Sequence, residues 1–160
     1  MEVYEWVIAV AGAVVSSAGV FGGVYGWRRW KVRRAERQMV RARETFHLRR
    51  EWLEARFVSL YSQGGTPRGL ECVDCDFENE VTFARDRTSG QLRALVGVTI
   101  SFKAIVGGGM EDNPNVGNLR VATAVFRFDG VEWTSTGEPK FNLNPAQVIA
   151  HYPQELETVD

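Results

Sequence analysis

The two cysteines are the side chains of this sequence best suited to covalent or metal chemistry. Cys72 and Cys75 stand three positions apart in the stretch CVDC, and the chain holds two cysteines in all. Such a pair can exchange a disulfide or supply half of a structural zinc site, which needs four ligands. No second pair follows, and the two histidines, His47 and His151, lack the spacing of metal ligands. The pattern therefore predicts no metal site.

The local sequence around the cysteines also argues against redox chemistry. A redox motif places its first cysteine at the start of a helix, whereas the stretch GLECVDCDF is typical of a strand. Side chains three apart in a regular strand point to opposite faces, so the two thiols would not meet. A cytoplasmic location would also keep them reduced. We interpret Cys72 and Cys75 as structural residues of a strand.

A glycine-rich loop is the second candidate, and we expect it either to contact a partner or to be purely structural. The stretch GGGMEDNPNVGN, residues 107–118, consists of turn-forming residues and is long for a connection between strands. Its acids do not follow the calcium-loop pattern, and no Gly-Lys-Ser/Thr ending makes it a phosphate-binding loop. The candidate partner residues are Met110, Glu111, Asp112 and Asn113.

No sequence motif for catalysis accompanies these candidates. The sequence has no nucleophile elbow, no recognisable Ser/His/Asp set and no helical His-Glu cluster. We therefore expect neither an enzyme nor a bound cofactor or metal. A small-molecule pocket in the sheet domain stays open as an alternative, because a cavity leaves no mark on a sequence.

Residues 64–160 are predicted to form an antiparallel sheet. The stretch QLRALVGVTISFKAIVG alternates between apolar and polar residues with period two, as in a long half-buried strand bent at Gly97. Upstream, residues 69–77 read as one strand, and EVTFARDRTSG reads as another that turns into the long strand. Two further strands are joined by the hairpin signal Asp-Gly at 129–130. The sheet should have about five strands.

A short C-terminal helix completes the predicted α+β domain. Asn144 is suited to cap it, Pro145 to begin it and Pro153 to stop it. Consecutive strands with helices packed on them form a two-layer domain, an outline similar to the cystatin-like and nuclear-transport-factor-like folds. That similarity concerns the fold outline alone.

A long helix is predicted over residues 28–63, which contain neither Pro nor Gly. Its first half is basic. Its second half carries an apolar face that should pack on the sheet domain, formed by Phe46, Trp52, Leu53, Phe57, Leu60 and Tyr61. A heptad spacing of Val32, Met39, Phe46, Leu53 and Leu60 leaves a dimeric coiled coil as an alternative, although Arg49 and Arg56 interrupt its seam.

The stretch from Trp6 to Trp27 is predicted to be a single transmembrane helix. Its 22 residues carry no charge, and at about 1.5 Å per residue they span a hydrocarbon layer of about 30 Å. A cleaved signal peptide would begin with basic residues, whereas this chain begins MEVYEW. The basic cluster that follows places the N-terminus outside an inner or plasma membrane and the C-terminal domain in the cytoplasm. The predicted domains are a 1–27 anchor, a 28–63 helix and a 64–160 sheet domain.

Two surfaces of this anchor are expected to make contacts. Small residues fall on one stripe of the predicted helix, which suits packing against a second copy or another membrane protein, namely Ala9, Gly12, Ser16, Gly19, Gly23 and Gly26. The membrane interface and anionic lipid should be contacted by Trp27, Arg28, Arg29, Trp30, Lys31, Arg33 and Arg34. No recognition motif accompanies the charge, so nucleic acid is not an expected partner.

The sequence thus predicts a single-pass, membrane-anchored binding or scaffold protein within a membrane assembly. Residues 28–56 carry eleven basic and four acidic side chains, whereas 57–160 carry eight basic and fourteen acidic ones. An apolar helix followed by an amphipathic helix and a sheet also resembles the type IV pilin and pseudopilin layout, with Glu5 where processed pilins carry a Glu. That resemblance implies an extracytoplasmic subunit, and the basic cluster, which should block export of the domain, makes it the alternative.

Overall fold

The computed structural model describes residues 36–64 and 66–159. The chain divides into two compact units, residues 1–41 and 42–160, and the described part of the first is helical. The predicted transmembrane segment 6–27 and the basic residues that follow it lie outside the described residues. Within the described residues, no helix combines the length and the apolar character that crossing a membrane requires.

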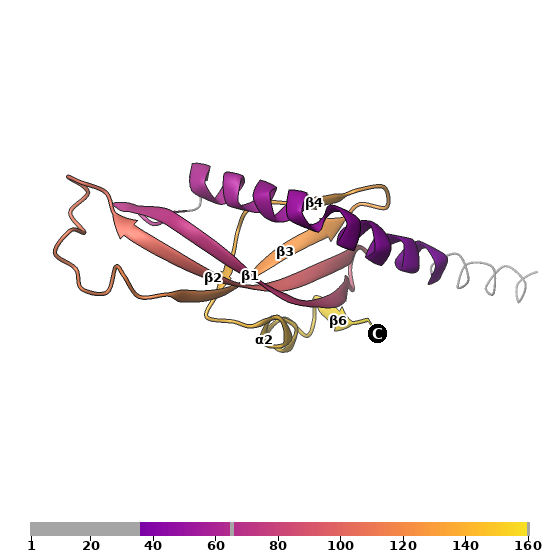
Figure 1. Cartoon of the computed structure of the whole chain (residues 1–160). Coiled ribbons are helices and arrows are strands. Elements are labelled where there is room, and N and C mark those ends of the chain that lie inside the picture. The colour runs from indigo at the N-terminus through magenta and orange to yellow at the C-terminus, as the bar shows by residue number, and fades with distance from the viewer. Residues whose placement is uncertain (1–35, 65, 160) are drawn as a thin grey trace, which may run out of the picture. The chain divides into compact units, whose positions relative to one another are not determined.

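The second unit is an α+β domain with helices on both faces of an antiparallel sheet (Figure 1). The long helix is described over 36–64; its part within this unit, residues 42–64, lies along one face, and a short helix, α2, lies on the other. The elements of the sheet and the short helix are β1 (Leu70–Asp86), β2 (Leu92–Ala104), β3 (Arg120–Phe128), β4 (Trp133–Ser135), β5 (Lys140–Phe141), α2 (Pro145–His151) and β6 (Leu156–Thr158). The strand order is β4-β3-β2-β1-β6, with β5 also paired to β3. The predicted fold class is confirmed for the described residues.

The long helix packs on the sheet through one apolar stripe. Phe46, Leu53, Phe57 and Tyr61 are completely buried, at spacings of seven, four and four residues that keep them on one side of a helix. Aromatic contacts join this stripe to the sheet, with ring centroids 5.5 Å apart between Phe46 and Phe126. Because Phe46 and Leu53 are covered by their own sheet, they are not available to the coiled-coil seam that the heptad spacing suggested.

Trp52 was expected on this apolar face, and that expectation is wrong. Its side chain is 59% exposed. It precedes Leu53 by one residue, which corresponds to about 100° around a helix, so it points away from the buried stripe. The helical face that contacts the sheet is therefore narrower than the run of apolar residues implied.

The region expected to hold two strands forms one strand, β1, of 17 residues. Its pairing with β2 is interrupted twice, between Cys72 and Asp74 and between Phe77 and Val81. At the second interruption the residues 78–80 bulge out opposite Gly97 of β2. The guanidinium of Arg50, on the long helix, donates hydrogen bonds to the carbonyl oxygens of Glu78 and Asn79. The bulge thus bends β1 under the helix without leaving these two carbonyls unpaired.

The remaining strands follow the predicted hairpins, with two short additions. β2 and β3 pair in continuous register from Leu92↔Phe128 to Ile100↔Arg120. The turn into β4 contains Asp129, whose carboxylate accepts hydrogen bonds of 2.8 Å from the amides of both Val131 and Glu132. β5 and β6 were not predicted, because strands of two and three residues show no alternation that a sequence pattern can reveal.

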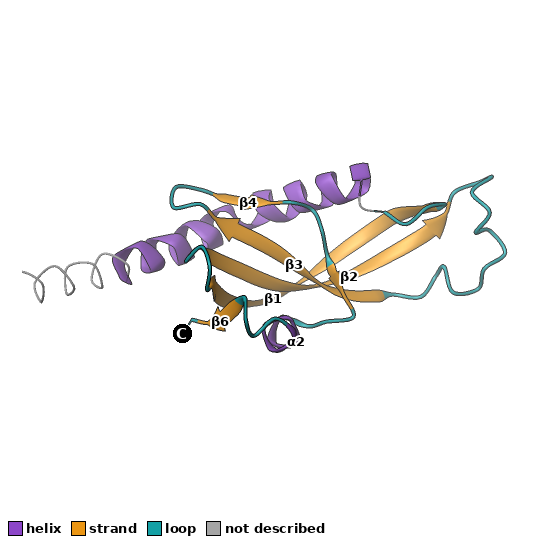
Figure 2. Ribbon diagram, turned by 180° about the vertical axis from the view of Figure 1, so that it is seen from behind, coloured by secondary structure: helices purple, strands orange, loops and turns teal. Residues whose placement is uncertain are grey.

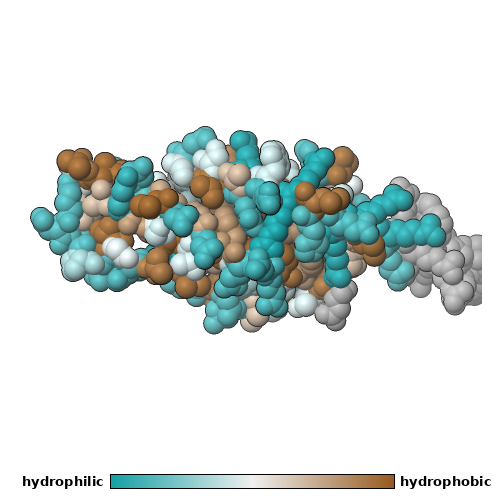
Figure 3. Space-filling view, in the orientation of Figure 1, coloured by the Kyte–Doolittle hydropathy of each residue, from teal (hydrophilic) through white to brown (hydrophobic). Residues whose placement is uncertain are grey.

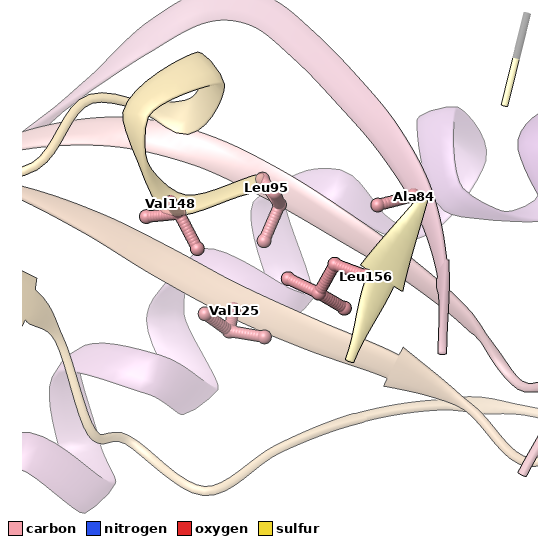
Figure 4. Close-up of a cluster of buried hydrophobic side chains, with 5 residues drawn as sticks. All are labelled: Ala84, Leu95, Val125, Val148 and Leu156. Atoms are coloured by element: carbon pink, nitrogen blue, oxygen red, sulfur yellow. The ribbon is translucent and has the colours of Figure 1, made fainter. Parts of the chain in front are cut away.

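Helix α2 covers the sheet face opposite the long helix, as Figure 2 shows from behind. Asn144 caps it as predicted, and Gln147 completes a reciprocal capping box. A second, smaller core forms beneath it, made of Ala84, Leu95, Val125, Val148 and Leu156 (Figure 4). The long connection from β3 to β6 is thereby tied to the sheet.

Candidate functional site

An apolar pocket lies where β2 leaves the sheet and β3 enters it. Its volume is about 300 Å³. The lining residues come from three separate segments: Pro67, Leu70, Phe102, Met110, Asn113, Asn115, Val116, Arg120, Phe141 and Asn142. We call this the end pocket. It places the predicted loop at a concave, mostly apolar site, the kind of surface that takes up ligands or partner side chains.

The floor of the end pocket is built by the sheet. Phe102 of β2 is buried, and its ring lies 6.4 Å from that of Tyr61 on the long helix. Leu70 pairs with Ala104 at the start of β1, two positions from the Cys72–Phe102 pair, so its side chain shares the face of Phe102. Phe141 of β5 closes the third side, with its ring 6.4 Å from Tyr61. The floor is therefore held by rigid elements.

The wall of the end pocket is the segment 105–119 that connects β2 to β3. Two glycines let this segment fold against residues 66–70: a Cβ on Gly108 would lie 2.9 Å from the Cα of Gly69, too close for any side chain. The amide of Ile105 donates a 2.9 Å hydrogen bond to the carbonyl of Gly69. The close approach of the two backbones explains why glycine occupies both positions and why the pocket has a fixed wall.

The four loop residues predicted to contact a partner have different surroundings. Met110 and Asn113 line the end pocket. Glu111 is exposed, and its carboxylate accepts a hydrogen bond from the amide of Gly107. Backbone amides of the loop, first its own and then that of Gly107, lower the pKa of Glu111. Asp112 is also exposed. Of these four residues, Met110 and Asn113 thus contribute to the pocket lining, and the carboxylate of Glu111 orders the loop itself.

Arg120 supplies the charge of the end pocket. It opens β3 at the pocket wall, and its side chain is exposed. Among the described residues no carboxylate forms an ion pair with it; the ion pairs seen there include Arg50–Glu54, Arg87–Glu157, Arg93–Asp86 and Lys103–Glu71. A guanidinium at the edge of an apolar pocket favours a ligand that combines an apolar body with a negative charge.

Exposed apolar side chains surround this end of the sheet. They flank the connecting segment on both sides and comprise Ile105, Val106, Leu119 and Val121, which are 45%, 94%, 67% and 51% exposed. In Figure 3 apolar residues alternate with polar ones over the end of the domain that lies at the left of the view. Apolar groups concentrated beside a pocket are a common mark of a contact surface.

The cysteine pair has a geometry that sequence reasoning missed. The sulfur atoms of Cys72 and Cys75 lie 3.4 Å apart, although residues three apart in a regular strand face opposite sides. The register shift at Val73 is the reason: Cys72 pairs with Phe102, Asp74 with Ser101 and Cys75 with Ile100. Val73 is the extra residue, so both thiols lie on the face of the long helix. The expectation that they point apart is wrong.

Burial raises the pKa values of the Cys75 thiol and of the neighbouring Tyr61 hydroxyl. Both cysteines are half-buried. Burial first, and then the hydrogen bond between the two thiols, raises the pKa of the Cys75 thiol to about 12. Burial and the charges of the two nearby thiols raise the pKa of the Tyr61 hydroxyl to about 12. That hydroxyl is buried and has no hydrogen-bond partner among the described residues.

A second, polar cleft of about 170 Å³ lies beside α2. It contains side chains of both signs, including Arg127, Lys140, Glu138 and Glu155. Because the lining carries charges of both signs, we do not assign a ligand class to this cleft.

Within 36–64 and 66–159, no three His, Cys, Asp or Glu side chains come together to hold an ion.

The predicted membrane-packing stripe from Ala9 to Gly26 and the interface residues 27–34 lie outside the described residues. The pocket floor was missed by sequence reasoning because nothing in the sequence shows that Leu70, Phe102 and Phe141 come together.

Comparison of the chain with models of protein families, with curated proteins and with solved structures finds no match.

Proposed function

We propose that this chain is a single-pass membrane-anchored binding protein that takes an apolar, acid-bearing group of a partner protein into the end pocket. The observation that carries the proposal is the 300 Å³ apolar pocket between the 105–119 segment and the sheet, with Arg120 at its wall. Its lining consists of apolar, amide and guanidinium side chains, none of which is a nucleophile or a general base. Binding is therefore proposed in preference to catalysis.

A protein partner is favoured over a free small molecule by the surroundings of the pocket. A small molecule would fill the cavity and leave the exposed Val106 and Leu119 beside it in water. A protein that inserts one side chain would cover these residues as well and gain the free energy of their burial, about 25 cal/mol per Å². An anchor side chain in a pocket, surrounded by apolar contacts, is the usual arrangement of an interface hot spot.

The placement of the domain in the cytoplasm follows from the charge rules applied to the sequence. The uncharged stretch 6–27 is long enough to cross a bilayer, and basic residues follow it at once. The partner would then be cytoplasmic or part of the same membrane assembly, with the small-residue stripe as a further contact inside the bilayer.

N-acetyl-phenylalanine is a suitable probe for the end pocket, because it joins an apolar ring to a carboxylate. A ligand of its size, about 15 non-hydrogen atoms, should bind with a dissociation constant of about 1 mM at roughly 0.3 kcal/mol per atom. Binding to the full chain in lipid nanodiscs is measured by saturation-transfer NMR. The neutral N-acetyl-phenylalaninamide should bind about threefold to tenfold more weakly, since it lacks the charge that Arg120 recognises.

Three variants decide whether the probe occupies the end pocket. Val116→Asp puts a carboxylate into the lining and should abolish binding, whereas Val131→Asp alters an 87% exposed valine in the β3–β4 turn and should leave it unchanged. Arg120→Gln should make N-acetyl-phenylalanine and N-acetyl-phenylalaninamide bind with equal affinity. If Val116→Asp binds the acid as well as the wild type does, the proposed site is wrong.

The side of the membrane is tested separately. In a chain with Cys72 and Cys75 replaced by serine, Val131→Cys offers one well-exposed thiol. A membrane-impermeant maleimide should label it only after the cells are permeabilised. Labelling in intact cells would place the domain outside and favour the pilin-like alternative.

A further inference from the structure

We propose that Cys72 and Cys75 form a redox site, in which a small-molecule disulfide such as glutathione disulfide oxidises the two thiols to an intrachain disulfide. The inference does not depend on the proposed binding function. It rests on the contact between the two sulfur atoms, 3.4 Å apart in the structure. A disulfide bond requires about 2.05 Å, so the sulfurs must approach by about 1.4 Å, a distance that small rotations of the side chains provide.

The bulge at Val73 makes this bond geometrically possible. In a regular strand three residues rise by about 10 Å, beyond the limit of about 7 Å between the Cα atoms of a disulfide. With Val73 as the extra residue, the partners of the two cysteines on β2 are Phe102 and Ile100, which are only two residues apart. Two residues rise by about 6.6 Å and share a face, which lies within the range that a disulfide accepts.

The oxidation takes two thiol–disulfide exchange steps. In the first, the thiolate of one of the two cysteines, for example Cys72, attacks the small disulfide. A protein–glutathione disulfide forms, the S–S bond of the reagent breaks, and one glutathione leaves as a thiol.

The second step closes the bond within the chain. Once Cys72 is bound to glutathione, it no longer shares a hydrogen bond or a negative charge with Cys75, and two of the causes that raised the pKa of Cys75 are removed. Cys75 loses its proton and attacks the sulfur of Cys72, and the second glutathione leaves. In total the protein loses two electrons and two protons, and one glutathione disulfide becomes two glutathione thiols.

The partial burial of both cysteines bears on whether they form an intrachain disulfide or a disulfide to a second protein molecule. They are half-buried, at the edge of the layer between β1 and the long helix, beside the buried hydroxyl of Tyr61. Because the two sulfur atoms lie 3.4 Å apart, each thiol is held beside the other before any second protein molecule arrives. The structure therefore favours an intrachain bond over a disulfide-linked dimer.

Equilibration of the full chain in lipid nanodiscs with graded ratios of glutathione and glutathione disulfide tests the proposal. Acid quenching, maleimide labelling and intact-mass measurement then count the free thiols and detect bound glutathione. The expected product has lost both thiols, carries no glutathione and remains a single chain. Cys72→Ser and Cys75→Ser should each give at most a glutathione adduct.

The same titration in urea shows whether the fold brings the thiols together. Because the native bulge already holds the sulfurs in contact, the equilibrium constant for closing the bond should be about tenfold larger in the folded chain than in the unfolded one. Equal constants, or glutathione adducts and dimers as the main products of the folded chain, would overturn the proposal.

Discussion

The indole nitrogen of Trp133 donates a hydrogen bond of 2.8 Å to the carbonyl oxygen of Ala42, which joins strand β4 to the long helix across 91 residues of sequence. The ring of Trp133 is buried and lies 5.0 Å from that of Phe46 and 5.2 Å from that of Phe128. One side chain thus fixes both the position of the helix on the sheet and the short strand at the sheet edge.

Replacement of this tryptophan should weaken the domain measurably. Trp133→Phe removes the hydrogen bond and part of the buried ring, and we expect the free energy of unfolding to fall by about 2 kcal/mol. Urea denaturation followed by circular dichroism measures the change. Trp52→Phe is the matched control, since Trp52 is 59% exposed and its replacement should cost less than about 0.5 kcal/mol. Equal effects of the two replacements would mean that Trp133 does not fix the helix.

Asp86 should make the stability of the domain depend on acid pH. Its carboxylate accepts hydrogen bonds from the amides of Ser89 and Thr88, at 2.8 and 3.0 Å, and forms an ion pair with Arg93. These contacts, the Ser89 amide first, lower the pKa of Asp86 below its ordinary value of 3.8. Because the folded state holds the proton more weakly than the unfolded state, the stabilisation is complete above about pH 4 and is lost as the pH falls through the lowered pKa.

The variant Asp86→Asn distinguishes the contribution of Asp86 to the pH dependence of stability from the contributions of the other acidic side chains. We expect it to lower the free energy of unfolding at pH 7 by about 1–3 kcal/mol, because Arg93 loses its charged partner. The difference from the wild type should shrink as the pH falls below 4, which urea titrations at a series of pH values will show. A difference that stays constant down to pH 2 would contradict the assignment.

Two glycines should respond very differently to alanine. Gly137 has a φ of +73°, and an added Cβ would lie 2.5 Å from the Cβ of Leu60 and 2.9 Å from the amide nitrogen of Tyr61. Gly137→Ala should therefore cost more than about 2 kcal/mol. The three atoms nearest to a Cβ on Gly97 all belong to the carboxyl group of Glu78, an exposed side chain that can move aside. Gly97→Ala should cost less than about 1 kcal/mol, and thermal unfolding of both variants checks the order.

The small-residue stripe of the predicted membrane helix offers a prediction for the anchor. Gly19→Leu together with Gly23→Leu should weaken self-association in a bilayer by about tenfold or more, because the larger side chains keep two backbones apart. Val14→Leu with Ala18→Leu adds bulk on the opposite side of the helix and is the control. Energy transfer between labelled chains in vesicles measures association. The stripe is not a contact surface if both pairs behave like the wild type.

Those parts of the fold that follow from local chemistry were predictable from the sequence. The alternation around Val96 and Val98, the Asp-Gly turn at 129–130 and the cap at Asn144 each depend on residues close in the chain. The α+β class follows from these elements because their apolar faces must be covered.

The candidate sites depend on relationships that a sequence pattern does not contain. Whether Cys72 and Cys75 meet is decided by one extra residue, Val73, and a bulge has no fixed sequence signal. The end pocket arises where Leu70, Phe102 and Phe141 converge from three strands. Each of these residues fits an ordinary strand, and only their convergence, together with the close approach of Gly69 and Gly108, encloses a cavity.

The irregular course of β1 also affects whether its open edge can pair with a strand of another copy of this domain. β6 covers the outer edge of β1 only at residues 84–86, so the edge before it is open among the described residues. Two bulges, carbonyls occupied by Arg50 and the acidic side chains of Asp74 and Asp76 make that edge a poor template for another strand. These features disfavour edge-to-edge pairing between sheets of neighbouring copies.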